Sequence, residues 1–140
     1  MVERNKIFID SNFYVAFYNP ADSLHKSALE VGKEIIDDIK IISNLVFSEI
    51  VTVLSQRVGK VTAVRVGDFL QSSSQVQSIH IDEYLQNESW KIFKQIAGKN
   101  ISFVDCSIIA AMNIEGINQL LTFDDDFKKL KRYHKFNFYI

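Results

Sequence analysis

The sequence is short of the residues that define several common kinds of protein. Its single cysteine, Cys106, excludes an internal disulfide and a zinc site built from several thiolates. Such scarcity is typical of proteins kept in a reducing compartment. One proline and five glycines among 140 residues leave little material for low-complexity linkers. We therefore expect one folded domain over residues 1–140.

The chain also lacks an excess of charge and any long apolar run. Its 16 basic and 17 acidic residues give a net charge of −1, so contact with nucleic acid must be local or depend on a bound cation. No run approaches the roughly 18 apolar residues of a membrane span, and the polar start Met1–Asn5 is unlike a signal peptide. We expect a cytoplasmic protein without membrane contact.

Short apolar runs alternate with stretches of helical periodicity. Runs without polar alternation predict buried strands, over residues 6–9, 39–42, 76–79, 119–122 and, at an edge, 136–140. Helical spacing predicts helices over residues 13–18, 24–39, 45–58, 60–70, 82–97 and 103–114, with a short one ending near 130. Asp22–Ser23 offers an N-cap for the second helix. The alternation predicts a mostly parallel sheet with helices on both faces.

The first run, Lys6–Ile9, leads into Asp10, and we expect it to be the central strand. An acid at the carboxyl end of a buried parallel strand lies where open α/β sheets place their active-site crevice. Taken alone, Asp10 is equally well explained as the cap of the next helix.

Three further acids lie after a strand or near the start of a helix. Glu49 lies inside the third helix, with apolar neighbours one turn away, so its carboxylate needs a partner; an ion pair with Arg57 or Arg65 is one alternative. Asp105 completes a capping-box pattern at the start of the most apolar helix. Asp124 follows the fourth strand, within Thr122–Asp125, which has the same capping pattern with Thr122 as the cap and Asp125 as the first-turn acid.

The carboxyl ends of parallel strands meet at one edge, which would gather Asp10, Glu49, Asp105 and Asp124 there. Clustered carboxylates repel one another and resist ionisation, and a divalent cation relieves that repulsion. Oxygen ligands without cysteine or a histidine motif favour Mg²⁺ or Mn²⁺ over zinc. A metal bound in this way is suited to phosphoryl chemistry.

At these segments the sequence resembles the PIN-domain ribonucleases, specifically the VapC-like toxins of bacterial and archaeal toxin–antitoxin pairs. The resemblance rests on Ile7–Asn12, Ser48–Glu49, Asp105–Ala111 and Leu121–Phe127. It spans nearly the whole chain, although residues 60–100 match only in helical character. It implies a three-layer α/β/α sandwich with a central, mostly parallel sheet.

The resemblance also implies a function and its residues. The activity would be Mg²⁺- or Mn²⁺-dependent endonucleolytic cleavage of single-stranded RNA by metal-activated water. The residues carried over are the metal-binding quartet Asp10, Glu49, Asp105 and Asp124, a more variable fifth acid Asp126, and the pocket residues Ser11 and Asn12. Members of this family commonly form homodimers and bind a protein antitoxin.

A dense basic run, Lys128–Lys135, begins two residues after the acids. Lys128 and Lys129 are candidates to guide the RNA backbone, and Tyr133 to stack on a base. A solvated helix end explains the run equally simply, because cations favour the carboxyl end of a helix.

Three other functions are compatible with parts of the pattern. A PIN-type nuclease that processes RNA without being a toxin would have the same acids. A phospho-acceptor receiver domain also has a strand-end aspartate, but it needs paired early acids and a late-strand lysine, which Leu120–Thr122 lacks. A non-catalytic binding module would not need four acids at these positions.

Overall fold

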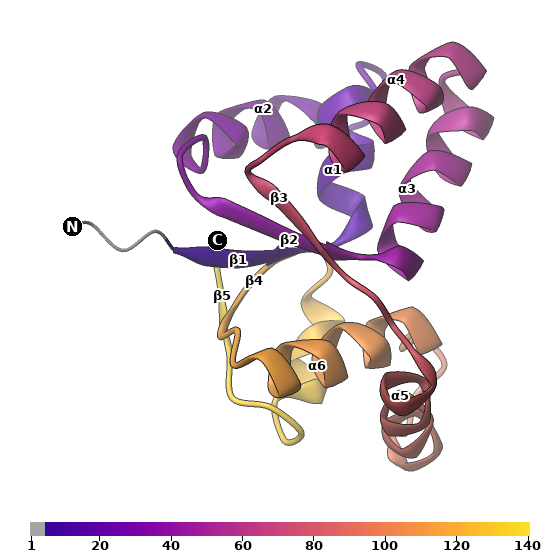
Figure 1. Cartoon of the computed structure of the whole chain (residues 1–140), viewed down its shortest axis with the longest axis vertical. Helices are drawn as coiled ribbons and strands as arrows, with labels where there is room; N and C mark the ends of the chain where they lie inside the picture. The colour runs from indigo at the N-terminus through magenta and orange to yellow at the C-terminus, as the bar shows by residue number, and fades with distance from the viewer. Residues whose placement is uncertain (1–4) are drawn as a thin grey trace.

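Five parallel strands form one sheet through the middle of the computed structural model, which describes residues 5–140 (Figure 1). The strands are β1 (Lys6–Ile9), β2 (Ile39–Ser43), β3 (Val76–Ile79), β4 (Gln119–Leu121) and β5 (Asn137–Phe138). Their order is β3-β2-β1-β4-β5, and every neighbouring pair is parallel. The prediction that Lys6–Ile9 is the central strand is therefore confirmed. The expectation about a signal peptide concerns residues 1–4, in part, and these lie outside the described residues.

Helices cover both faces of the sheet, which confirms the three-layer α/β/α prediction. Figure 1 shows four helices on one side: α1 (Ser11–Tyr18), α2 (His25–Glu34), α3 (Asn44–Arg57) and α4 (Lys60–Ser72). On the other side lie α5 (Glu83–Gln95) and α6 (Phe103–Glu115). A 3₁₀ helix, η1 (Asp125–Leu130), contacts α6. No helix among residues 5–140 is long and apolar enough to cross a bilayer.

The core forms where the apolar runs meet. Ile7, Phe8 and Ile9 of the central strand are fully buried, and so are Ile108 and Met112 of α6. Burial of each such side chain contributes roughly 1.5–3 kcal/mol. The strand that leads into Asp10 is thus held within the buried core of the molecule.

The second helix is shorter than predicted. It ends at Glu34 rather than near Ile39, and its N-cap residue is Leu24, whose side chain makes no capping bond. Asp22 accepts instead from the Leu24 backbone, one step outside the helix. The prediction extended the helix through Asp37–Asp38, where two acids would oppose the negative end of the helix dipole. Those residues form a turn, and Ile39 begins β2.

Other boundaries moved by smaller amounts. The first helix begins at Ser11 rather than at Phe13, because Asp10 caps it. The last strand has two residues, Asn137–Phe138, rather than five. Val76–Ile79 was predicted with the correct bounds, and its exposed polar residues are explained by its position at an edge of the sheet.

Candidate active site

The acids lie around the carboxyl edge of the sheet, which is on the right in Figure 1, between α3 above and α5 and α6 below. Asp10 directly follows β1, and Asp124 comes three residues after the end of β4. Glu49 lies in α3, which begins where β2 ends, and Asp105 is in the first turn of α6. Because β1, β2 and β4 are parallel and adjacent, their carboxyl ends share this edge.

Asp10 is buried, with 5% of its surface exposed, and both of its oxygens accept hydrogen bonds. Oδ1 accepts from the Ser11 backbone at 2.8 Å, so Asp10 does cap α1. Oδ2 accepts from the Thr122 hydroxyl at 2.8 Å and from the Asn12 amide at 3.3 Å. The capping interpretation is therefore confirmed for one oxygen, while the other is bound by side chains from two elements.

A network through Asn12 and Thr122 ties the loop after β4 to the end of β1. The Asn12 amide donates to the Thr122 hydroxyl oxygen at 3.1 Å, and Asn12 Oδ1 accepts from the Phe123 backbone at 3.2 Å. Thr122 also accepts from the Asp124 backbone at 3.0 Å. Two side chains thus fix Asp124 relative to Asp10.

Sequence reasoning missed Thr122 as a site residue. It was assigned to the fourth strand and to the cap of the following helix, but the cap of η1 is Asp124, whose Oδ1 accepts from the Asp126 backbone at 2.9 Å. The available signal was a hydroxyl residue placed directly after the buried pair Leu120–Leu121, at the same edge as Asp10.

Glu49 finds its partner in a hydroxyl group rather than in a cation. Ser11 donates a hydrogen bond from its Oγ to Glu49 Oε1. The alternative of an ion pair with Arg57 or Arg65 is wrong within residues 5–140, where neither arginine forms a salt bridge and both are exposed. Ser11 therefore links α1 to α3 at the place where the acids gather.

Asp105 closes the predicted capping box. Its backbone donates to the Ser102 hydroxyl at 3.0 Å, and its Oδ2 accepts from the Ser102 backbone at 2.9 Å. This fixes the carboxyl group at the start of α6, with its other oxygen making no hydrogen bond within the described residues.

The pKa values of Asp10 and Asp105 reflect the neighbouring acids. Burial, together with the charges of Asp105 and Glu49, raises the pKa of Asp10 to about 7, against hydrogen bonds from Thr122 and Ser11. Burial likewise raises the pKa of Asp105 to about 6, with added repulsion from Asp124 and Glu49. Four carboxyl groups from four elements thus form one electrostatically coupled set.

A tighter group of acids lies at the start of η1. Asp124, Asp125 and Asp126 each place a carboxylate oxygen within 4.8 Å of the other two, and residues 5–140 hold no other acid, histidine or cysteine trio at that spacing. The carboxylates of the quartet Asp10, Glu49, Asp105 and Asp124 are therefore less closely spaced than those of this trio. A set of oxygen donors that ionises fully when a cation compensates its charge fits Mg²⁺ or Mn²⁺.

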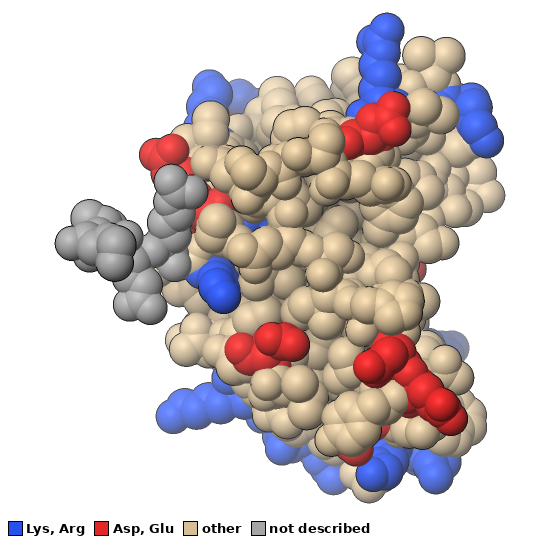
Figure 2. Space-filling view, in the orientation of Figure 1, with Lys and Arg blue, Asp and Glu red and all other residues tan. Residues whose placement is uncertain are grey.

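The basic run is partly engaged with its own neighbours. Lys129 lies 3.3 Å from Asp126, and Lys128 lies 3.8 Å from the exposed Asp125. The Arg132 guanidinium lies over the Tyr133 ring, 4.9 Å from its centroid, so one face of that ring is already covered. On the face shown in Figure 2, charged side chains form small separate groups and most of the surface is uncharged.

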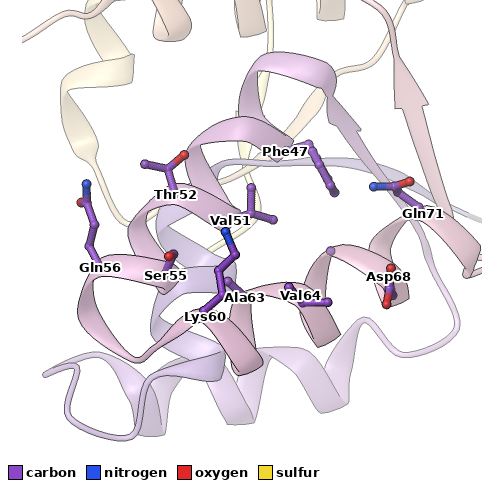
Figure 3. A pocket seen from close by; sticks show the side chains of 11 residues that line it. Phe47, Val51, Thr52, Ser55, Gln56, Lys60, Ala63, Val64, Asp68 and Gln71 are labelled. Carbon is purple, nitrogen blue, oxygen red and sulfur yellow. The ribbon is translucent and has the colours of Figure 1, made fainter.

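A separate hollow of about 440 Å³ lies between α3 and α4 (Figure 3). Its walls include Phe47 and Val51 of α3 and Val64 of α4, with Lys60 and Asp68 at its margin. None of the acids described above lines it. The acidic edge and this hollow are therefore distinct features.

Comparison with known proteins identifies one family and relatives that align over most of their length. Residues 7–133 match the family described as PIN domain. The 23S rRNA-specific endonuclease VapC20 of Mycobacterium tuberculosis, from strains CDC 1551 / Oshkosh and ATCC 25618 / H37Rv, is 30% identical over 121 residues, which cover 86% of this chain and 91% of VapC20.

Two solved structures share the architecture. The crystal structure of M. tuberculosis VapC20, a Sarcin-Ricin loop cleaving toxin, has a TM-score of 0.82 at 28% identity and covers 89% of this chain and 94% of that one. VapBC2 from Rickettsia felis, bound to a DNA fragment from their promoter, has a TM-score of 0.62 at 19% identity and covers 95% and 98%. The second comparison concerns the fold alone.

Proposed function

This chain belongs to the PIN-domain family, and from that premise we propose that it is the endoribonuclease toxin of a toxin–antitoxin pair, acting on single-stranded RNA with Mg²⁺ or Mn²⁺. The observation that carries the proposal is Asp10. It is a buried carboxyl group at the end of the central strand, with a pKa of about 7 and with two other acids close enough to raise it. A protein has little reason to bury such a group unless a cation compensates its charge.

The proposed ligands are Asp10, Glu49, Asp105 and Asp124, with Asp126 as a fifth acid. When bound, the cation supplies charge neutralisation, polarisation of the phosphodiester and activation of water. The protein's part is to hold the carboxylates in place. Asn12 and Thr122 orient Asp10 and the Asp124 loop, and Ser11 orients Glu49.

Lys128 and Lys129 are proposed to position the RNA backbone beside the acids. Both lie on η1, where the pair begins two residues after Asp126, and their side chains are 64% and 44% exposed. Their ion pairs are exposed ones, which are worth little and exchange readily for a phosphate. A protein antitoxin and a second copy of the chain are the proposed protein partners, by analogy with the family.

Strand order distinguishes this fold from that of a receiver domain, which also has an aspartate at the end of a strand. Receiver domains have the order 2-1-3-4-5, whereas the order here is 3-2-1-4-5. The receiver alternative is therefore rejected on topology. The choice between toxin and RNA-processing nuclease is addressed by expressing the chain in bacteria, alone and together with any small reading frame found next to its gene. Growth arrest that such a neighbour relieves supports the toxin.

The direct test is cleavage of a labelled single-stranded RNA with Mn²⁺, with Mg²⁺, or with EDTA. We expect cleavage with either ion, none with EDTA, and none by Asp10→Asn. Asp68→Asn is the matched control, because it makes the same chemical change on an exposed acid of α4, and it should cleave at the wild-type rate. Full activity of Asp10→Asn, or full activity in EDTA, would contradict the proposal.

A further inference from the structure

Three aromatic side chains form a partly exposed cluster at the junction of α5 and α6. Trp90 and Phe93 of α5 are stacked, with ring centroids 5.6 Å apart and planes 17° apart. Phe103, the first residue of α6, lies 6.4 Å from the Trp90 ring and 6.2 Å from the Phe93 ring. Trp90 is 50% exposed and Phe93 36% exposed. Large aromatic surface left in water in this way indicates a binding surface rather than core.

Lysines are the charged residues within this stretch of the sequence. Residues 89–104 contain Lys91, Lys94 and Lys99 and no acid, while Glu88, which pairs with Lys91 at 3.2 Å, and Asp105 lie directly outside it. Lys94 comes four residues after Trp90, and therefore shares its side of α5. Gln86 and Asn87, four and three residues before Trp90, share that side as well. The surface thus combines aromatic rings, a cation and neutral hydrogen-bonding groups, the combination that single-stranded nucleic acids bind.

The cluster also adjoins the acids. Phe103 and Asp105 both lie in the first turn of α6. Two residues apart, they point to different sides of the start of this helix. The rings and the acid are thus brought together at one end of α6, within a single helical turn.

We propose that Trp90, Phe93 and Phe103 form a base-stacking subsite for the single-stranded RNA substrate, beside the acids at the start of α6, with Lys94 contacting the backbone. The subsite rests on the proposed nuclease function for its substrate. It is separate from the acids and from η1. Rings bind the faces of bases, and each stacked base is held with little dependence on its identity.

Trp90 is the only tryptophan in the chain, so its fluorescence reports on this subsite alone. In EDTA, where no cleavage is expected, titration of the wild-type protein with a 12-nucleotide oligouridylate should quench that fluorescence to saturation. The apparent affinity should fall as salt rises, because phosphate contacts release counterions. Absence of quenching while the same RNA is cleaved in Mn²⁺ would overturn the subsite and leave the nuclease proposal intact. Quenching without cleavage in Mn²⁺ would contradict the nuclease proposal and leave the binding surface intact.

Steady-state cleavage of the same RNA in Mn²⁺ separates binding from chemistry. Trp90→Ala should raise KM by roughly 5- to 150-fold, the loss expected for one stacked base, while kcat stays near the wild-type value. Trp90→Phe should restore most of the affinity. The matched control is Tyr84→Ala, which removes another exposed aromatic residue of α5, 57% exposed and on a different side of the helix; it should leave KM unchanged.

A second copy of the chain is the competing occupant of this surface. In that case Trp90→Ala would convert a dimer to a monomer by size-exclusion chromatography with light scattering, and RNA would fail to quench Trp90 in the wild type. That pair of results would overturn the subsite. An unchanged oligomeric state together with the KM increase supports it.

Discussion

Replacing Asp10 by asparagine separates the electrostatic penalty of a buried carboxylate from its use in metal binding. Burial raises the pKa of Asp10 from 3.8 to about 7. At about 1.4 kcal/mol per pH unit, the ionised form therefore destabilises the metal-free folded protein by about 4 kcal/mol above pH 7. The neutral amide removes this penalty.

The same substitution removes hydrogen bonds. Asn places an amide NH₂ where Oδ2 now accepts from the Thr122 hydroxyl and the Asn12 amide. Losing one or two such bonds costs about 1 kcal/mol each. The expected net change at pH 8 is a gain of about 2 kcal/mol, or roughly 4–8 °C in Tm for a chain of this size.

The sign depends on pH. Because the folded-state pKa is the higher one, the folded protein binds more protons than the unfolded chain between about pH 4 and pH 7, so wild-type stability falls as pH rises through that range. At pH 5, only about one pH unit above the unfolded-state pKa of 3.8, the penalty is about 1.6 kcal/mol, and the lost hydrogen bonds offset the gain from removing it. We expect the Tm of Asp10→Asn to be equal to or below that of the wild type at pH 5 and above it at pH 8.

The assay is thermal unfolding followed by circular dichroism in EDTA, at both pH values, on wild type and Asp10→Asn. Mn²⁺ adds a second readout, since 100-fold excess over Kd should stabilise the wild type by about 2.7 kcal/mol and the variant by much less. An offset in Tm that is the same at pH 5 and pH 8 would refute the raised pKa. Equal stabilisation of both proteins by Mn²⁺ would refute Asp10 as a ligand.

Four further substitutions test the surrounding structure. Thr122→Val keeps the shape of the side chain but removes the 2.8 Å donor to Asp10; we expect a loss of about 1–3 kcal/mol by urea unfolding, together with lower RNA cleavage. Lys128→Ala and Lys129→Ala should each change stability by less than about 0.5 kcal/mol, since their ion pairs are exposed, yet each should weaken RNA binding and reduce its salt slope by about one. Gly116→Ala should cost about 1 kcal/mol, because φ at this helix end is +68°; unchanged urea midpoints would contradict this.

The parts of the fold that depend on local sequence were predictable. Ile7–Ile9 reads as a doubly buried strand because nothing polar interrupts it, and it is fully buried at the centre of the sheet. The capping box at Ser102–Asp105 depends on two residues three apart, and it formed as expected. The predicted boundary was wrong where an apolar stretch joins a helix to a strand, as at Ile39. Periodicity alone does not mark where the helix ends and the strand begins.

The candidate residues could be nominated from the sequence, but their contacts could not. Asp10 and Asp124 follow strands, and Glu49 and Asp105 lie near the starts of helices, so a parallel sheet was expected to gather them at one edge. Whether these four bind a metal stays a prediction. The pairing of Ser11 with Glu49, in place of an arginine, depends on how α1 packs against α3, and no local pattern encodes that packing.

The sequence alone determined the alternation of strands and helices, the burial of β1 and the acids that follow the strands, since each of these depends on residues close together in the chain. The tertiary structure decided which groups share hydrogen bonds and charge. Thr122 became a partner of Asp10 across 112 positions, and Asp10 acquired its pKa of about 7 from burial and from acids on other elements. Those properties arise from proximity in space, which exists only once the sheet and its helices have packed.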